Sequence, residues 1–202
     1  MRHLLLLALS LSTPAFALDL QPQNYAFSAP TACGTWCYHD PDMTKLTDGV
    51  VGNAGWAYRQ GQEWAGWVGQ SVVHIDFHFS QANTFNSVSV GSTQDRLDDV
   101  ALPSFDLYAK ENGQWVWKAS LENPPSSANN VDPYSSAPHG FFTFSNLQIH
   151  SQDLRLSARA NGPWTFIDEV RFAGVVPEAE TWAMLGSGLG LLALAARRRR
   201  RA

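Results

Sequence analysis

The 202-residue sequence has few charged residues, only two cysteines and none of the common catalytic signatures. Charged residues make up 16% of the chain and hydrophobic residues 45%, so most of it can bury enough apolar surface to offset its ordering entropy, which excludes wholesale disorder. The sequence has no Gly-x-Ser-x-Gly elbow, His-Glu-x-x-His pair, phosphate loop or glycine-rich dinucleotide turn. We therefore expect a protein without enzymatic activity.

Basic residues are scarce in the central part of the chain, residues 18–177. Setting aside Arg2 and the five C-terminal arginines leaves 8 of the 14 basic residues, and setting aside Glu178 and Glu180 leaves 16 of the 18 acidic ones. The net charge of this part is therefore −8, and no stripe of Lys and Arg alternates with its aromatic residues. Such a surface repels phosphates, which excludes nucleic acid as the partner.

The N-terminus has the three parts of a secretion signal. A basic segment with Arg2 precedes the apolar residues 4–11, and a small-x-small cleavage pattern ends at Ala17. Cleavage there predicts an exported protein. The expected organisation is a signal peptide at residues 1–17, one domain at residues 18–174 and a C-terminal sorting segment at residues 175–202.

The C-terminus combines a Pro-Glu pair, an apolar run and an arginine cluster. Pro177 and Glu178 precede Trp182, and we expect a membrane helix over about residues 182–196. This run is shorter than the roughly 20 residues that cross a bilayer comfortably. By the positive-inside rule the arginines that follow stay in the cytoplasm, so the preceding domain faces outward. These arginines are Arg197, Arg198, Arg199, Arg200 and Arg201.

This arrangement resembles the PEP-CTERM sorting domain of Gram-negative bacteria, over about residues 175–202. The resemblance implies recognition by an exosortase, a membrane protease or transpeptidase, in bacteria that make exopolysaccharide. It also implies a precursor anchored in the inner membrane that is later cut and reaches the envelope or the extracellular space. One position departs from the family pattern, since Ala179 stands where a second motif proline is usual. A plain membrane tail anchor is the alternative.

The two cysteines, Cys33 and Cys37, lie four positions apart in an Ala-Cys-Gly-Thr-Trp-Cys-Tyr segment. In an exported protein this spacing favours a disulfide, with Gly34 in the tight turn, and its expected role is to stiffen the loop. A redox pair is the alternative, although no thioredoxin-like βαβ pattern surrounds it. A zinc site would need further ligands, and only His39 is near.

Between the two signals, apolar and polar residues alternate with a period of two. The alternating segments are residues 72–79, 85–90, 105–109, 140–144, 154–158 and 167–172. Turn-forming clusters such as residues 80–83 separate them, and no convincing helical stripe occurs. We predict an all-β fold, an antiparallel β-sandwich of the jelly-roll type. In the first segment His74, Asp76 and His78 share a face, which we interpret as a solvated sheet face in preference to a metal site.

The order of four short motifs is similar to that in discoidin-like, galactose-binding-like jelly rolls, over about residues 40–173. The motifs are Lys-Leu-Thr-Asp-Gly at 45–49, Trp-Ala-Gly-Trp-Val-Gly at 64–69, Val-Ala-Leu-Pro-Ser-Phe-Asp-Leu-Tyr at 100–108 and Trp-Thr-Phe-Ile-Asp-Glu-Val at 164–170. The resemblance implies eight strands whose loops at one end bind a glycan or another surface ligand. It also implies a structural Ca²⁺ held by Asp48, Glu169 and backbone carbonyls of residues 46–53. A simple Asp-Gly turn is the alternative.

Candidate ligand residues lie on the loops between the expected strands. Sugars present apolar C–H faces to aromatic rings, and their hydroxyls bond to Arg, Asn, Asp and His. These candidates are Trp56, Tyr58, Arg59, Arg96 and His139. We expect the other tryptophans of this region to serve mostly in core and edge packing: Trp64, Trp67, Trp115, Trp117 and Trp164.

The sequence as a whole therefore predicts an exported envelope or matrix protein that binds a glycan or another surface ligand. Its expected partners are an exosortase, the inner membrane as a precursor and exopolysaccharide or another glycan. A hydrolase acting on extracellular polysaccharide and a purely structural surface protein are the alternatives.

Overall fold

The computed structural model describes residues 17–52, 56, 63–94, 99–122, 140–175 and 189. The contacts divide the chain into two units, one of which is Leu18–Gly174. The other joins Met1–Ala17 and Val175–Ala202 and lies almost entirely outside the described residues, as do the predicted signal peptide and membrane helix. In the described part of the chain, no helix is long and apolar enough to cross a membrane.

The described residues of the larger unit form β-strands and a single 3₁₀ turn, η1. The elements are β1 (Ala17–Leu20), β2 (Asn24–Phe27), η1 (Lys45–Thr47), β3 (Ala65–Val68), β4 (Val72–Ser92), β5 (Ser104–Glu111), β6 (Gln114–Leu121), β7 (Gly140–Phe144), β8 (Ile149–Arg159) and β9 (Trp164–Val175). Strands β2 to β9 pair antiparallel with one another. The predicted all-β, antiparallel fold class is confirmed.

Strand β4 belongs to both halves of the sheet. Its residues 72–78 pair with β8 and its residues 85–92 pair with β9, while β2 and β7 flank the two halves. The register against β8 shifts between His78 and Asn83. The predicted turn at residues 80–83 is therefore wrong, because an irregularity in the pairing with β8 accommodates these residues within one continuous strand.

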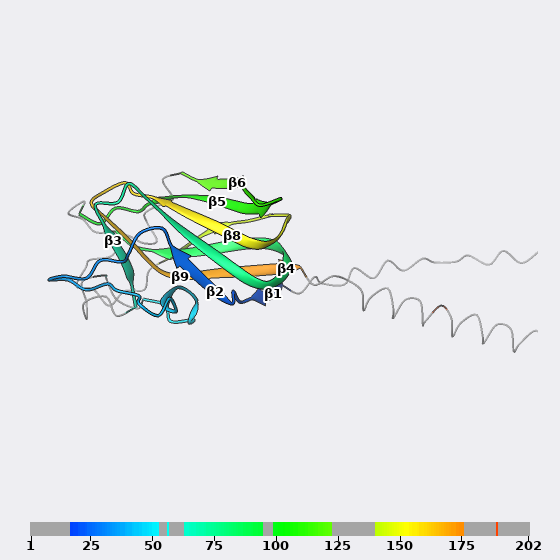
Figure 1. The fold of residues 1–202 in the computed structure, drawn as a ribbon, viewed down its shortest axis with the longest axis horizontal. Helices are drawn as coiled ribbons and strands as arrows, with labels where there is room; N and C mark the ends of the chain where they lie inside the picture. The colour runs from blue at the N-terminus through cyan, green and yellow to red at the C-terminus, as the bar shows by residue number, and fades with distance from the viewer. Residues whose placement is uncertain are drawn as a thin grey trace, which may run out of the picture. The chain divides into compact units, whose positions relative to one another are not determined.

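The two halves pack face to face around an aromatic core, with β5, β6 and β8 in the upper layer of Figure 1 and β9 in the lower one. Phe77 of β4 lies 4.8 Å from Phe172 of β9 between ring centroids. Phe79 lies 4.9 Å from Phe85 and 5.1 Å from Phe172. Because side chains alternate along a strand, residues 73, 75, 77 and 79 of β4 all face this core, which is why a period of two predicted the strand.

Two strands depart from simple alternation. β9 is buried at every position from Thr165 to Val170, because β3 and β4 flank it and the loop after η1 bonds to Asp168 and Glu169. β6 was not among the expected strands. It carries Trp115 and Trp117 on the side opposite the core, so apolar residues occur on both of its faces and hide the period.

Candidate functional site

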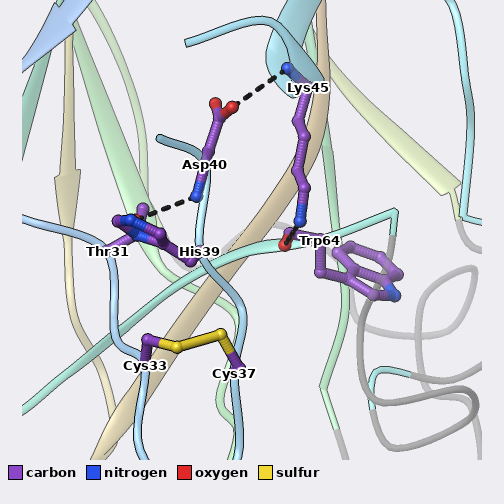
Figure 2. Close-up of a disulfide and its surroundings, with 7 residues drawn as sticks. All are labelled: Thr31, Cys33, Cys37, His39, Asp40, Lys45 and Trp64. Carbon is purple, nitrogen blue, oxygen red and sulfur yellow. Dashed lines mark hydrogen bonds between the residues drawn. A yellow bond between two sulfur atoms is a disulfide. The ribbon is translucent and has the colours of Figure 1, made fainter. Parts of the chain in front are cut away.

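A disulfide-closed loop stands at one end of the sandwich, before β3. Cys33 and Cys37 form the predicted disulfide, and their backbones make an isolated antiparallel bridge (Figure 2). The Ala32 N–H donates to the Gly66 carbonyl of β3, and the Tyr38 N–H donates to the Ala32 carbonyl. These bonds anchor the base of the loop to the sheet while the residues between the cysteines remain exposed.

A buried carboxylate, Asp40, holds the chain that follows this loop. Its Oδ2 accepts a hydrogen bond of 2.5 Å from the Tyr25 hydroxyl, and its Oδ1 accepts one of 3.1 Å from the Thr44 N–H. The Leu46 N–H in turn donates to the Tyr25 oxygen at 3.0 Å. Burial and the hydrogen bond to Asp40 raise the pKa of the Tyr25 hydroxyl, so it remains a donor. We call Tyr25, Asp40 and the backbone that they bind the Asp40 network.

Two carboxylates from β9 meet the loop that follows η1. Glu169 Oε2 accepts a hydrogen bond of 3.1 Å from the Gly49 N–H, and Asp168 Oδ2 accepts one of 2.6 Å from the Gly52 N–H. Asp48 lies in the same loop, next to Gly49. The structure therefore brings the two predicted calcium ligands, Asp48 and Glu169, to one place, and it adds Asp168, which the sequence did not single out as a ligand.

The electrostatics of this carboxylate group are set first by burial and then by the neighbouring charges. Burial, with smaller contributions from Asp48 and Asp168, raises the pKa of Glu169 to about 7, although the Gly49 N–H and Arg171 act against this shift. A cation would relieve this repulsion. Within the described ranges, no three His, Cys, Asp or Glu side chains are placed to hold a metal ion by themselves. A cation here would thus need backbone carbonyls as further ligands.

Of the five residues predicted to contact the glycan or surface ligand, only Trp56 lies within the described part of the chain. Its ring stacks on Phe166, with 5.5 Å between centroids and 13° between planes, and meets Tyr38 edge-on at 6.2 Å. It therefore packs in a second aromatic cluster beside the main core. The other candidates lie outside the described residues, and their roles stay predictions: Tyr58, Arg59, Arg96 and His139.

The tryptophans divide into buried and exposed ones. Trp64 and Trp67 are buried, as expected. Trp117 lies on strand β6 and is 57% exposed, more than expected for a residue of the core or of a packed edge. Trp36 is 44% exposed in the disulfide loop. Trp36 was not among the ligand residues predicted from the sequence. Its position between two cysteines four residues apart is the signal that could have found it, because so short a loop cannot cover a large ring.

The face of β4 that carries the two histidines makes hydrogen bonds across to β8. Asp76 accepts two hydrogen bonds from Arg155, at 2.6 and 2.7 Å. His78 Nδ1 lies 2.7 Å from the Asp153 carboxylate, and His74 Nδ1 lies 2.7 Å from a serine hydroxyl of β8. Each side chain has its own partner on the neighbouring strand, which agrees with the interpretation of a solvated sheet face.

Residues 175–201 match the PEP-CTERM protein-sorting motif. This chain carries a PEP-CTERM sorting motif. The match includes Pro177, Glu178, Trp182 and the arginines up to Arg201, in spite of Ala179. The motif implies an exported protein with a membrane-anchored precursor. No curated protein is recognisably similar in sequence to this PEP-CTERM chain.

Several solved structures share the fold of the PEP-CTERM chain. Truncated AlyQ, with CBM32 and alginate lyase domains, matches with a TM-score of 0.53 and 15% identity, covering 82% of this chain and 35% of that one. The C-terminal domain of a chitobiase from Bacteroides fragilis matches with a TM-score of 0.51 and 12% identity, covering 79% of this chain and 100% of that one. The CBM32-1 and CBM32-2 domains of Clostridium perfringens ZmpB, in complex with GalNAc, match with a TM-score of 0.52 and 10% identity, covering 76% and 33%.

These similarities show the fold. The described β-sandwich has the architecture of family 32 carbohydrate-binding modules. The PEP-CTERM chain spans about a third of the AlyQ and ZmpB chains that it matches.

Proposed function

We propose that this PEP-CTERM protein is an exported envelope or matrix protein whose β-sandwich binds a glycan. The observation that carries the proposal is the union, in one chain, of a sorting motif with the fold of carbohydrate-binding modules. The disulfide loop gives further support, because it offers an exposed tryptophan on a covalently closed frame. Aromatic faces of this kind stack on the C–H faces of sugars.

Binding fits the described residues better than hydrolysis does. Glycoside hydrolysis needs two carboxyl groups on opposite sides of the bond to be cut. Asp168 and Glu169, the adjacent pair on β9, instead both hold backbone N–H groups of the loop after η1. They therefore serve that loop, and the hydrolase alternative has no comparable support among the described residues.

A glycan array probed with the purified protein tests the binding function. We expect retention on one class of glycan, without new reducing ends when the same soluble oligosaccharide is incubated with the protein. New reducing ends would replace the binding proposal with the hydrolase. If the array shows neither binding nor cleavage, the structural surface protein is the interpretation that stays.

The carboxylate group at the loop after η1 is proposed to hold a structural Ca²⁺. Asp48 and Glu169 would supply carboxylate oxygens, and backbone carbonyls of residues 46–53 would complete the set, as suits a hard cation. The arrangement supports a cation, because the carboxylate of Glu169 is buried beside Asp168 and close to Asp48, and a cation would offset their negative charge. The ion would fix the loop against β9.

Thermal unfolding with calcium and with chelator tests this site. Because an ion that binds only the folded state stabilises it, we expect Ca²⁺ to raise the Tm of the parent protein. Glu169→Gln should remove the response, whereas Glu111→Gln, at the end of β5, should retain it. An equal Tm in calcium and chelator would refute the calcium site and leave glycan binding untouched.

The sorting motif is proposed to act through an exosortase that recognises Pro177 and Glu178, with the apolar segment in the inner membrane and the arginines as the cytoplasmic stop. Glu178→Ala leaves the hydrophobicity of the segment unchanged, so a full-length anchored precursor should accumulate in membrane fractions. Replacing the five arginines by Ser should instead let the short segment slip through the membrane. If the Glu178 variant were processed like the parent, a passive tail anchor would be the better account.

A further inference from the structure

An open cleft of about 430 Å³ lies beside the disulfide loop. Residues 32–36 line it on one side, and Val68 of β3 and Trp164 of β9 complete the lining. Trp36 is 44% and Val68 46% exposed, so both side chains are open to solvent. The volume lies within the range of roughly 300 to 1,000 Å³ that is usual for small-molecule sites.

The wall of the cleft that the loop forms is held in place. The disulfide joins Cys33 to Cys37, and the Gly34 N–H donates to the Trp36 carbonyl at 3.0 Å across the turn. The base of the loop is bonded to β3 through Ala32. Such cross-links reduce the conformational entropy that the loop would otherwise lose when a ligand binds.

The wall that the sheet forms is held equally well. Val68 and Trp164 are direct partners in the antiparallel pairing of β3 with β9. The Trp164 ring stacks on Phe166, with 5.4 Å between centroids and 4° between planes. The backbone N–H of Trp164 donates to the Asp99 carbonyl at 3.1 Å. The cleft is therefore preformed on both sides.

The chemistry of the lining favours a neutral ligand with a flat apolar side. Among the described residues that line the cleft, none is charged, and Thr35 supplies the hydroxyl. Residues 18–177 carry a net charge of −8, which opposes the approach of acidic polysaccharides. A pyranose ring without charge combines a C–H face for tryptophan with hydroxyls for Thr35 and the exposed loop backbone.

We propose that this cleft, bounded by the disulfide loop, Val68 and Trp164, binds a neutral pyranose ring of the glycan. The inference rests on the proposed glycan-binding function and names its site and the charge class of its sugar. Trp36 stacks on the C–H face of the ring, and the disulfide holds Trp36 in place. The predicted ligand residue Trp56 instead packs in the second aromatic cluster.

Fluorine NMR of the purified protein labelled with 5-fluorotryptophan locates the site directly. The probes are methyl β-D-galactopyranoside, methyl β-D-glucopyranoside, N-acetyl-D-galactosamine and any neutral oligosaccharide that the array detects. Each tryptophan gives its own resonance, and the Trp36, Trp164 and Trp117 lines are assigned from their loss in single Trp→Phe variants. We expect a saturable shift of the Trp36 and Trp164 lines with at least one probe, while the Trp117 line stays in place.

The same experiment separates this inference from the general function. If the array detects a glycan that moves only other tryptophan lines, or detects only acidic glycans, the protein remains a glycan binder and the cleft assignment is overturned. If neither the array nor any probe gives binding, the glycan function and the cleft assignment fall together.

A matched pair of variants measures the contribution of the aromatic face. Trp36→Ala should weaken binding about tenfold, because it removes the stacking ring. It should change the Tm little, because Trp36 is an exposed residue outside the hydrophobic core. Trp117→Ala removes a tryptophan that is still more exposed, on β6, and should leave affinity unchanged. Equal losses in the two variants, or no loss in Trp36→Ala, would overturn the proposal.

Discussion

Two polar networks in this sandwich use the same kinds of side chain in different surroundings. In the Asp40 network the carboxylate is 3% exposed and bonds to a tyrosine and to backbone N–H groups. On the outer face of β4 and β8, Asp76 and Arg155 are paired side chain to side chain, with exposed fractions of 38% and 24%. Buried polar groups cost much to leave unpaired, whereas half-exposed ion pairs can exchange their partner for water. The fold therefore depends on the first network far more than on the second.

Asp40→Ala should show the largest effect. It leaves the Tyr25 hydroxyl and the Thr44 N–H without their acceptor, and a buried donor without a partner costs about 1 to 3 kcal/mol. We expect a loss of about 3 kcal/mol in the free energy of unfolding, measured by urea denaturation. Asp40→Asn keeps an acceptor oxygen and should lose less. A loss below about 1 kcal/mol for Asp40→Ala would remove the contrast between the two networks.

Tyr25→Phe tests the same network from its other end. The change removes the acceptor of the Leu46 N–H and a donor to Asp40, so we expect a loss of about 2 kcal/mol in unfolding free energy. The parent should also lose stability as the pH rises above 10.0, the ordinary tyrosine pKa, because the unfolded state releases this proton more easily than the folded state does. Tyr25→Phe lacks this contribution, so its stability should decline less steeply between pH 10 and 11. Parallel declines would contradict the buried position of the hydroxyl.

The disulfide should contribute about 2 kcal/mol or less to the free energy of unfolding, since the loop that it closes is short. We expect Cys33→Ser with Cys37→Ser to lower the Tm modestly and to leave the far-ultraviolet circular dichroism spectrum unchanged. Intact-mass measurement after alkylation without reductant should show no alkyl groups added to the two cysteines of the parent. Two freely alkylated thiols would reject the disulfide in solution.

Asp76→Ala should have the smallest effect. Its hydrogen bonds raise the pKa of Arg155, yet both side chains are partly solvated and water can replace the lost partner. We expect a change within about 1 kcal/mol in unfolding free energy, and less in 1 M salt. A loss as large as that of Asp40→Ala would show that the outer face is structurally as important as the Asp40 network.

The sequence predicted those parts of the fold that depend on a pattern among neighbouring residues. Alternation in β4, β5 and β8 follows from one face meeting the core, and Cys33 and Cys37 are close enough along the chain for their pairing to need no tertiary information. The sorting motif was likewise found because its order of Pro-Glu, apolar run and arginines is local. In each case neighbours in sequence determine the structure.

The features that were missed depend on residues far apart in the chain. The polar run at residues 80–83 is typical of a turn, and only the pairing of β4 with both β8 and β9 keeps it within a strand. Nothing in the local sequence distinguishes Asp40 from the other acidic residues, because its partners are Tyr25 and the backbone of Thr44. The cleft at Trp36 similarly needs β3 and β9 beside the disulfide loop. No local pattern contains these partners.

The long strand β4 has a consequence for the order of folding. Its partners lie on both sides of it in the sequence, from β2 at Asn24–Phe27 to β9 at Trp164–Val175, so the sheet depends on contacts of high contact order, which form slowly. The last partner, β9, ends where the sorting motif begins. If the predicted signal peptide leads the chain across the membrane N-terminus first, β4 is outside before β9 can complete its half of the sheet. The exposed edge of β4 is therefore open to wrong pairing until the chain has emerged as far as the sorting motif, so that closure of the sandwich and arrival of the sorting signal coincide.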